Sequence, residues 1–263
     1  MKDVIADLET IRDPDNPAAG DDDRVPAAPH HRIVCAGALM LDEKLKLRGV
    51  RTFTDEREGV LSLTRTLSDT RTRLVTFGGR RFDLPVLAAG CLRFGVPFPR
   101  WFCGGNGDAS FRYRFAVRPH LDLMDWLADH GAAIPWGMGP TTRLFGLPGK
   151  VSATGGEVAT LHAAGKLDEI VAYNVEDLIA TTLLHLRLSL CRGELAPSDY
   201  RSVVSELLED AVREQRPAEQ RHPEDREPRT IDEQFLERAL DKYATNAAFR
   251  ELLAEVCLEC RSE

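Results

Sequence analysis

The chain has 263 residues, 43% of them hydrophobic and 29% charged, which is the composition of an ordinary globular protein with one domain or one and a half. No run of about 18 apolar residues occurs, so a membrane-spanning helix is excluded, and the N-terminus lacks the basic and apolar segments of a secretory signal. The net charge of −8 argues at first against a nucleic-acid partner, and six scattered cysteines indicate free thiols in a cytoplasmic protein.

The N-terminal third is predicted to consist mainly of strands joined by turns. Apolar and β-branched runs, bounded by polar or Gly- and Pro-rich segments, predict strands over residues 3–10, 32–41, 45–53 and 72–77. Apolar residues at helical spacing predict helices over 55–70 and 82–95, the second of which ends at Gly95.

The rest of the chain is predicted to be mainly helical. One further strand is expected over 113–118 or over 120–123. Helical spacing then recurs over 123–131, near 141–146, and over 154–165, 166–190, 202–214 and parts of 230–260. Strands followed by strand–helix units predict an α/β fold, in which helices flank a mixed five-stranded sheet. We expect this domain to span residues 1–194, followed by an acidic helical C-terminal extension over 195–263.

Charge is distributed unevenly between these two parts. Residues 196–263 hold 17 Asp and Glu against 10 Lys and Arg, a net charge of −7, which leaves −1 for the first 195 residues. Residues 71–118 hold nine arginines and two acids, interleaved with aromatic residues. Arginines attract phosphates and rings stack on bases, so this region is a candidate surface for a nucleic-acid strand. The acidic extension is expected to pack on the core, with a homo-oligomer contact or a protein partner as the alternatives.

Two acids in the first predicted strand are candidate metal ligands. Asp7 and Glu9 flank Leu8, and the two-residue period of a strand sends both carboxylates to one face. Buried together they repel unless a cation lies between them, and oxygen ligands favour Mg²⁺ or Mn²⁺ over zinc. The alternative is a strand edge that exposes both acids to water.

Three further residues extend this candidate site. Asp83 opens a predicted helix just after a strand, where the helix dipole stabilises an acid and where the sites of α/β proteins collect. Tyr173 and Asp177 lie one helical turn apart, so the phenol and the carboxylate share one face of the helix. A phenol is protonated at neutral pH, so it guides a water molecule better than it deprotonates one.

In this order, Asp7-x-Glu9, Phe82-Asp83 after a Gly-rich turn, and Tyr173-x-x-x-Asp177 resemble the three exonuclease motifs of the DEDD superfamily in its tyrosine variant. The phrases GGRRFDLPVL, HLDLMDWL, GLPGK and AAGKLDEIVAYNVEDLIATTLLHLR resemble a bacterial family of predicted 3′–5′ exonucleases related to the proofreading domain of family-B DNA polymerases. The resemblance runs over residues 2–192. It implies an RNase H-like fold and two-metal hydrolysis of phosphodiester bonds at the 3′ ends of nucleic acids.

The resemblance also implies a role for each candidate residue. Asp7, Glu9 and Asp177 would hold the first of two divalent cations, Mg²⁺ or Mn²⁺. Asp7 would bridge to the second cation, Asp83 would support that cation, and Tyr173 would orient the attacking water. Substrate contacts are expected at Leu8, Thr10, Gly78, Gly79, Arg80, Arg81 and Phe82.

One departure from the family's pattern leaves alternatives open. The second motif usually begins with asparagine, and Gly78 in its place keeps the turn but removes a side-chain hydrogen bond. We therefore expect a 3′–5′ exonuclease acting on single-stranded DNA. The alternatives are an exoribonuclease of RNase D type and a weakly active or inactive nucleic-acid-binding module. A lone pair, Cys257-x-x-Cys260, is not enough to predict a zinc site.

Overall fold

The computed structural model describes residues 1–17, 25–103, 110–144, 146 and 157–213, with short pieces between 234 and 251. Cys257, Cys260 and most of the helical residues predicted over 230–260 lie outside this described part. The four cysteines within it are free thiols, as their spacing predicts. None of the helices in the described ranges combines the length and the apolar character that a membrane crossing requires.

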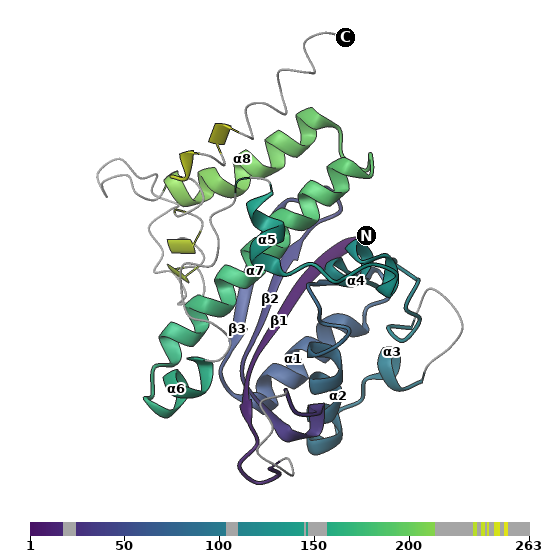
Figure 1. The fold of residues 1–263 in the computed structure, drawn as a ribbon, viewed down its shortest axis with the longest axis vertical. Helices are drawn as coiled ribbons and strands as arrows, with labels where there is room; N and C mark the ends of the chain where they lie inside the picture. Colours follow the sequence, from purple (N-terminus) through teal and green to yellow (C-terminus); the bar gives the residue numbers. More distant parts are fainter. Residues whose placement is uncertain are drawn as a thin grey trace.

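Five strands form one mixed sheet, which confirms the predicted sheet (Figure 1). β1 (Lys2–Arg12), β2 (His31–Leu41) and β3 (Leu47–Phe53) form an antiparallel meander. β4 (Thr72–Thr76) and β5 (His120–Asp122) run parallel to β1. Of the two candidate segments for the last strand, the one at 120–122 forms it. The order is β3-β2-β1-β4-β5, so β1 lies at the centre of the sheet.

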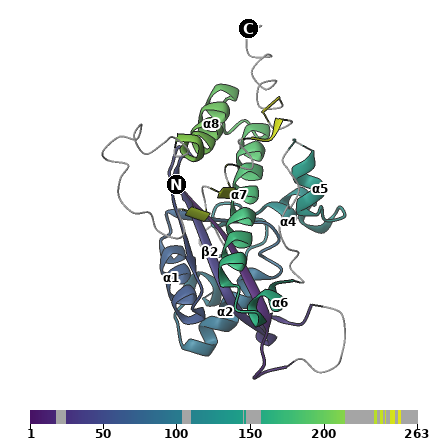
Figure 2. The same ribbon diagram turned by 90° about the vertical axis from the view of Figure 1, so that its left-hand side faces the viewer.

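Helices cover both faces of this sheet (Figures 1 and 2). α1 (Glu56–Ser68) and α2 (Asp83–Phe94) pack on one face, and α7 (Leu167–Cys191) crosses the other. α2 ends where the sequence predicts, because Gly95 takes a left-handed conformation with φ of 65° and caps the helix. The α/β architecture with flanking helices is therefore confirmed.

The alternation of β1 divides its side chains between these two layers. Leu8 packs with α1 and α2, whereas Ile5 packs with α7. Asp7 and Glu9 follow Ile5 at intervals of two residues, so they leave the sheet on the face that α7 covers. The central strand thus aims two acids at one long helix.

Shorter elements connect these layers. The helix predicted over 123–131 is broken, because Asp129 and His130 take positive φ angles of 46° and 53°. The short elements are η1 (Ala28–His30), α3 (Pro99–Phe102), α4 (Leu123–Leu127), η2 (Asp129–Gly131), α5 (Met138–Arg143) and α6 (Val158–Ala163).

The first helix of the C-terminal extension, α8 (Pro197–Arg213), packs on the core. Tyr200, Val204 and Leu207 are buried in the same apolar cluster as α7. Outside this cluster, the ammonium group of Lys46 donates a hydrogen bond of 3.0 Å to Glu206. The boundary between residues 194 and 195, and a partner or homo-oligomer contact through 195–263, stay predictions.

Candidate active site

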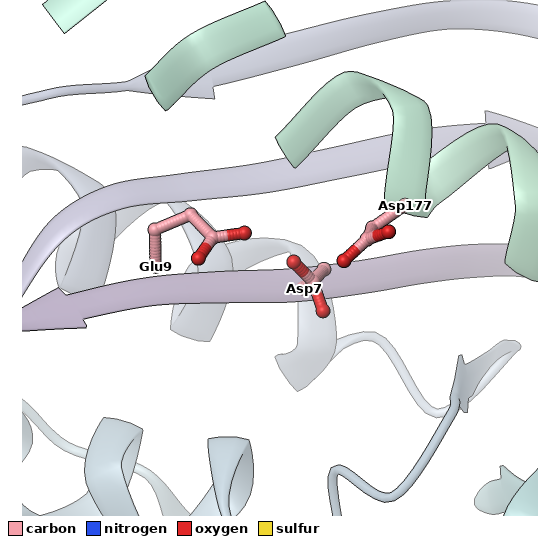
Figure 3. Close-up of side chains that lie close together, drawn as sticks. All are labelled: Asp7, Glu9 and Asp177. Carbon is pink, nitrogen blue, oxygen red and sulfur yellow. The ribbon is translucent and has the colours of Figure 1, made fainter. Parts of the chain in front are cut away.

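Three carboxylates meet where α7 crosses β1 (Figure 3). Asp7 and Glu9 come from β1 and Asp177 comes from α7, and ligating oxygens of all three lie within 4.8 Å of one another. Glu9 is buried and the other two are half-buried. Negative charges this close repel one another in a poorly solvated site, so the group is suited to holding a cation.

Asn174, which no motif in the sequence singles out, holds Asp7 in this group. Its Nδ2 donates to the carboxylate oxygen Oδ2 of Asp7 at 2.9 Å and to the backbone carbonyl of Asp7 at 3.2 Å. The amide is completely buried. Gly37 lies opposite Asp7 in β2, and a Cβ there would come within 1.8 Å of Asn174 Oδ1. A glycine inside a strand is the sequence signal for such a close approach.

Asp83 lies beside this group and is tied to the same strand. It is the first residue of α2, and its Oδ1 accepts a hydrogen bond of 3.0 Å from the backbone nitrogen of Leu8. Desolvation raises the pKa of Asp83 to about 7, the hydrogen bond from Leu8 opposes this rise, and the charges of Asp122 and Asp177 add to it. The carboxylate form is therefore disfavoured until positive charge is supplied nearby.

The turn that precedes Asp83 depends on two glycines and one aspartate. Gly78 has a φ of 82°, which glycine and asparagine adopt far more readily than other residues. A Cβ on Gly79 would lie 2.7 Å from the side chain of Thr76. Asp122, which also caps α4, accepts hydrogen bonds from the backbone nitrogens of Gly78 at 2.9 Å and Arg80 at 2.7 Å. These bonds hold the turn without an asparagine side chain.

The other residues expected at the site lie around the same strand. The Leu8 side chain is buried in the core, so Leu8 offers the site its backbone amide. Thr10 Oγ1 lies 3.0 Å from His31 Nδ1, and Phe82 packs edge-on against the His31 ring at 4.9 Å between centroids. Tyr173 is buried on α7, one turn before Asp177.

Most arginines of residues 71–118 form ion pairs or hydrogen bonds within the protein, so fewer of them are left for the candidate nucleic-acid surface. Arg73 is paired with Asp3, and Arg93 is paired with two other acids. Arg100 is buried and donates to three backbone carbonyls. Four arginines are exposed near the turn and the segment before β5, and Arg114 among them is paired with Asp125: Arg81, Arg112, Arg114 and Arg118.

The sequence of the chain matches one family of proteins. The family model described as "Predicted 3'-5' exonuclease related to the exonuclease domain of PolB" matches residues 25–225. The chain belongs to this family. The match to the PolB-related exonuclease family includes Asp83, Tyr173 and Asp177 but begins after Asp7 and Glu9. Asp7 and Glu9 are therefore assigned to the site from the geometry of the sheet and not from the family match.

One solved structure shows how the PolB-related exonuclease chain compares with a larger protein. The family B DNA polymerase from the hyperthermophilic archaeon Pyrobaculum calidifontis is similar over 81% of this chain, with 14% identity and a TM-score of 0.49. The similar part is 29% of the polymerase chain, so this chain spans less than a third of that protein. None of the curated proteins matches the chain.

Proposed function

We propose that the chain is a metal-dependent 3′–5′ exonuclease that hydrolyses phosphodiester bonds at the 3′ ends of single-stranded DNA. The observation that carries the proposal is the group formed by Asp7, Glu9 and Asp177, whose ligating oxygens lie within 4.8 Å of one another. Membership of the PolB-related exonuclease family supports the reaction class.

The residues present fit two divalent cations. All the donors are carboxylate oxygens, the ligands that Mg²⁺ and Mn²⁺ prefer over the nitrogen and sulfur ligands common for zinc. Asp7, Glu9 and Asp177 would hold one cation, and Asp7 and Asp83 would hold the second. The raised pKa of Asp83 supports this assignment, because a nearby cation would restore its carboxylate form. Bound there, the cations would stabilise the attacking and leaving oxygens of the phosphodiester.

Three residues of the chain would position the attacking water, the carboxylate of Asp7 and the substrate phosphate. Tyr173, on the same helix face as Asp177, would orient the attacking water through its hydroxyl group. Asn174 would keep the carboxylate of Asp7 in one orientation through its hydrogen bond of 2.9 Å. Arg81, exposed in the turn beside Asp83, would contact substrate phosphate.

Further substrate contacts would come from the same two segments. Thr10 and Phe82 converge on His31, near the end of β1 that follows Glu9. Gly78, Gly79 and Arg80 shape the turn through which the chain reaches Asp83.

A degradation assay tests this proposal. The substrates are 5′-labelled single-stranded DNA, duplex DNA and RNA, each with Mg²⁺, Mn²⁺ or EDTA. The wild type is expected to give a metal-dependent ladder that shortens from the 3′ end of single-stranded DNA. Asp7→Ala and Asp177→Asn should abolish the ladder. Glu43→Gln, which removes an exposed acid from the turn after β2, should leave it unchanged.

Each outcome decides a different part of the proposal. A preference for RNA would keep the chemistry and replace the substrate. A folded wild type without cleavage in either metal would overturn the enzymatic proposal and favour a nucleic-acid-binding module. Cleavage that persists in both carboxylate variants would show that the three carboxylates do not form the catalytic site.

A further inference from the structure

A cavity of about 350 Å³ lies on the other side of the 78–81 turn, between the turn and α4. Its volume falls in the range of about 300–1,000 Å³ that is usual for small-ligand sites. Arg80, Arg81 and Arg114 line it together with the apolar side chains of Met124 and Pro135. A ligand with both an anionic and an apolar part matches this lining.

The acids of the cavity are already engaged, so its open side is positive. Both carboxylate oxygens of Asp122 accept backbone hydrogen bonds from the turn. Asp125 is paired with Arg114 and with His130. The Arg114 side chain is still 46% exposed, and Arg81 is exposed as well. Within the described residues no acid forms an ion pair with Arg81, so its guanidinium is available to an anion.

Two exposed rings flank Arg114, a residue of the cavity wall, in the sequence. Phe115 is 62% exposed and Tyr113 is 48% exposed, with 6.1 Å between their ring centroids. Phe115 packs against His130 at 4.9 Å, and His130 Nδ1 lies 3.2 Å from Asp125 in the cavity wall. An exposed ring beside arginines is the combination on which single-stranded nucleic acids stack their bases.

The cavity is linked to the carboxylate site through the 78–81 turn. Arg80 and Arg81 line the cavity and directly precede Phe82 and Asp83. Asp83 accepts its hydrogen bond from Leu8, which lies between the two acids of β1. Asp122, in the cavity wall, accepts hydrogen bonds from the backbone nitrogens of Gly78 and Arg80 in the same turn. One turn of backbone therefore separates the cavity from the carboxylates.

We propose that this cavity binds one nucleotide of the substrate strand on the 5′ side of the scissile bond. The phosphate of that nucleotide lies on Arg81 and Arg114, and its base stacks on Phe115. This inference rests on the proposed exonuclease function and deepens it. A base that stacks on a ring of the protein must be unpaired, so the cavity selects single strands over duplexes.

Binding measurements in EDTA test the cavity without cleavage. The probes are fluorescein-labelled oligothymidylates of two to eight nucleotides, followed by fluorescence anisotropy. The wild-type dissociation constant is expected to fall with length until the cavity is filled. Phe115→Ala should raise it about ten-fold for the longer oligomers and flatten the length dependence. Leu92→Ala, which removes a similarly exposed apolar side chain on α2, should keep the wild-type length dependence.

Salt dependence separates a phosphate contact from a structural role. The association constant falls as salt is added, and the slope of its logarithm against the logarithm of the salt concentration is negative. Arg81→Gln should reduce the magnitude of this slope by about 0.7, the value for one phosphate contact on a single strand. The proposal is overturned if Phe115→Ala and Arg81→Gln both bind all lengths as the wild type does, or if a duplex of equal length binds as tightly.

The two proposals fail separately. Length-dependent binding that Phe115→Ala removes, in a protein without nuclease activity, would support the cavity and overturn the exonuclease. Normal cleavage with unaltered binding in both cavity variants would overturn the cavity and leave the exonuclease standing.

Discussion

Replacing Asn174 by alanine should weaken metal binding more than it weakens the fold. The change removes two hydrogen bonds to Asp7, one of them to a carboxylate, with a combined net value of about 2–4 kcal/mol. Asn174 Oδ1 is buried without a hydrogen-bond partner in the described residues, and its removal returns about 1–3 kcal/mol. Because these terms largely offset each other, we expect a loss of only about 1 kcal/mol in the free energy of unfolding.

Metal affinity should respond more strongly, because the freed carboxylate of Asp7 can rotate away from its partners. Loss of such a supporting contact typically lowers metal affinity by about 10- to 100-fold. The assay is a titration of Mn²⁺ and Mg²⁺ against the rate of 3′-end cleavage, read as the half-saturating metal concentration. Activity should largely return at saturating metal.

A variant of the same helix controls for stability. Thr182 is buried on α7 and its hydroxyl donates to the carbonyl of Leu178, within the helix. Thr182→Ala should therefore leave the half-saturating metal concentration at the wild-type value. If Asn174→Ala shows the wild-type value as well, then Asn174 does not position Asp7.

Three further predictions concern the turn, the buried ion pair and the metal. Gly78→Asn should cost less than about 1 kcal/mol in urea unfolding and Gly78→Val about 1–3 kcal/mol, because of the φ of 82°; equal costs would contradict this. Asp3→Asn should cost about 3–5 kcal/mol at pH 7, since it breaks a buried pair with Arg73. Burial raises the pKa of Asp3, but hydrogen bonds from His185 and Arg73 outweigh it and hold the pKa below 3.8. The difference in stability between Asp3→Asn and the wild type should therefore shrink as the pH falls below 3.8. A difference that stays constant with pH would refute the assignment. Mn²⁺ at 100 times its dissociation constant should stabilise the wild type by about 2.7 kcal/mol, seen as a higher melting temperature, and equal stabilisation of Asp177→Asn would contradict the site.

The sequence predicts the sheet and the long helices because their patterns are local. The alternation in β1 and the helical spacing of 166–190 each depend on neighbouring residues only, and the structure agrees with both. The segments 113–118 and 120–123 are both short and alternate apolar with polar residues, so only the pairing with β4 decides between them. Charge counts fail in the same way, since they cannot show which arginines meet an acid from a distant segment.

The residues of the candidate site differ in the same way, because local patterns predict some of them and not others. Motif spacing finds Asp7, Glu9 and Asp177, and the fold brings them together. Spacing does not find Asn174, because a polar residue in a helix is usually solvated and its partner lies on another element. Gly37 in the middle of β2 is the one local signal, and it indicates a close approach without naming what approaches.

The contact between Asn174 and Asp7 also fixes when the site can exist during folding. It joins residues 167 positions apart, and contacts so distant form late because the entropy of closing the loop must be offset first. A refolding chain would therefore gain its helices before it gains affinity for metal. An ion that binds only after α7 has docked lowers the rate at which α7 undocks and leaves the rate of docking unchanged. The bound metal would then slow the unfolding of the native state without speeding its folding.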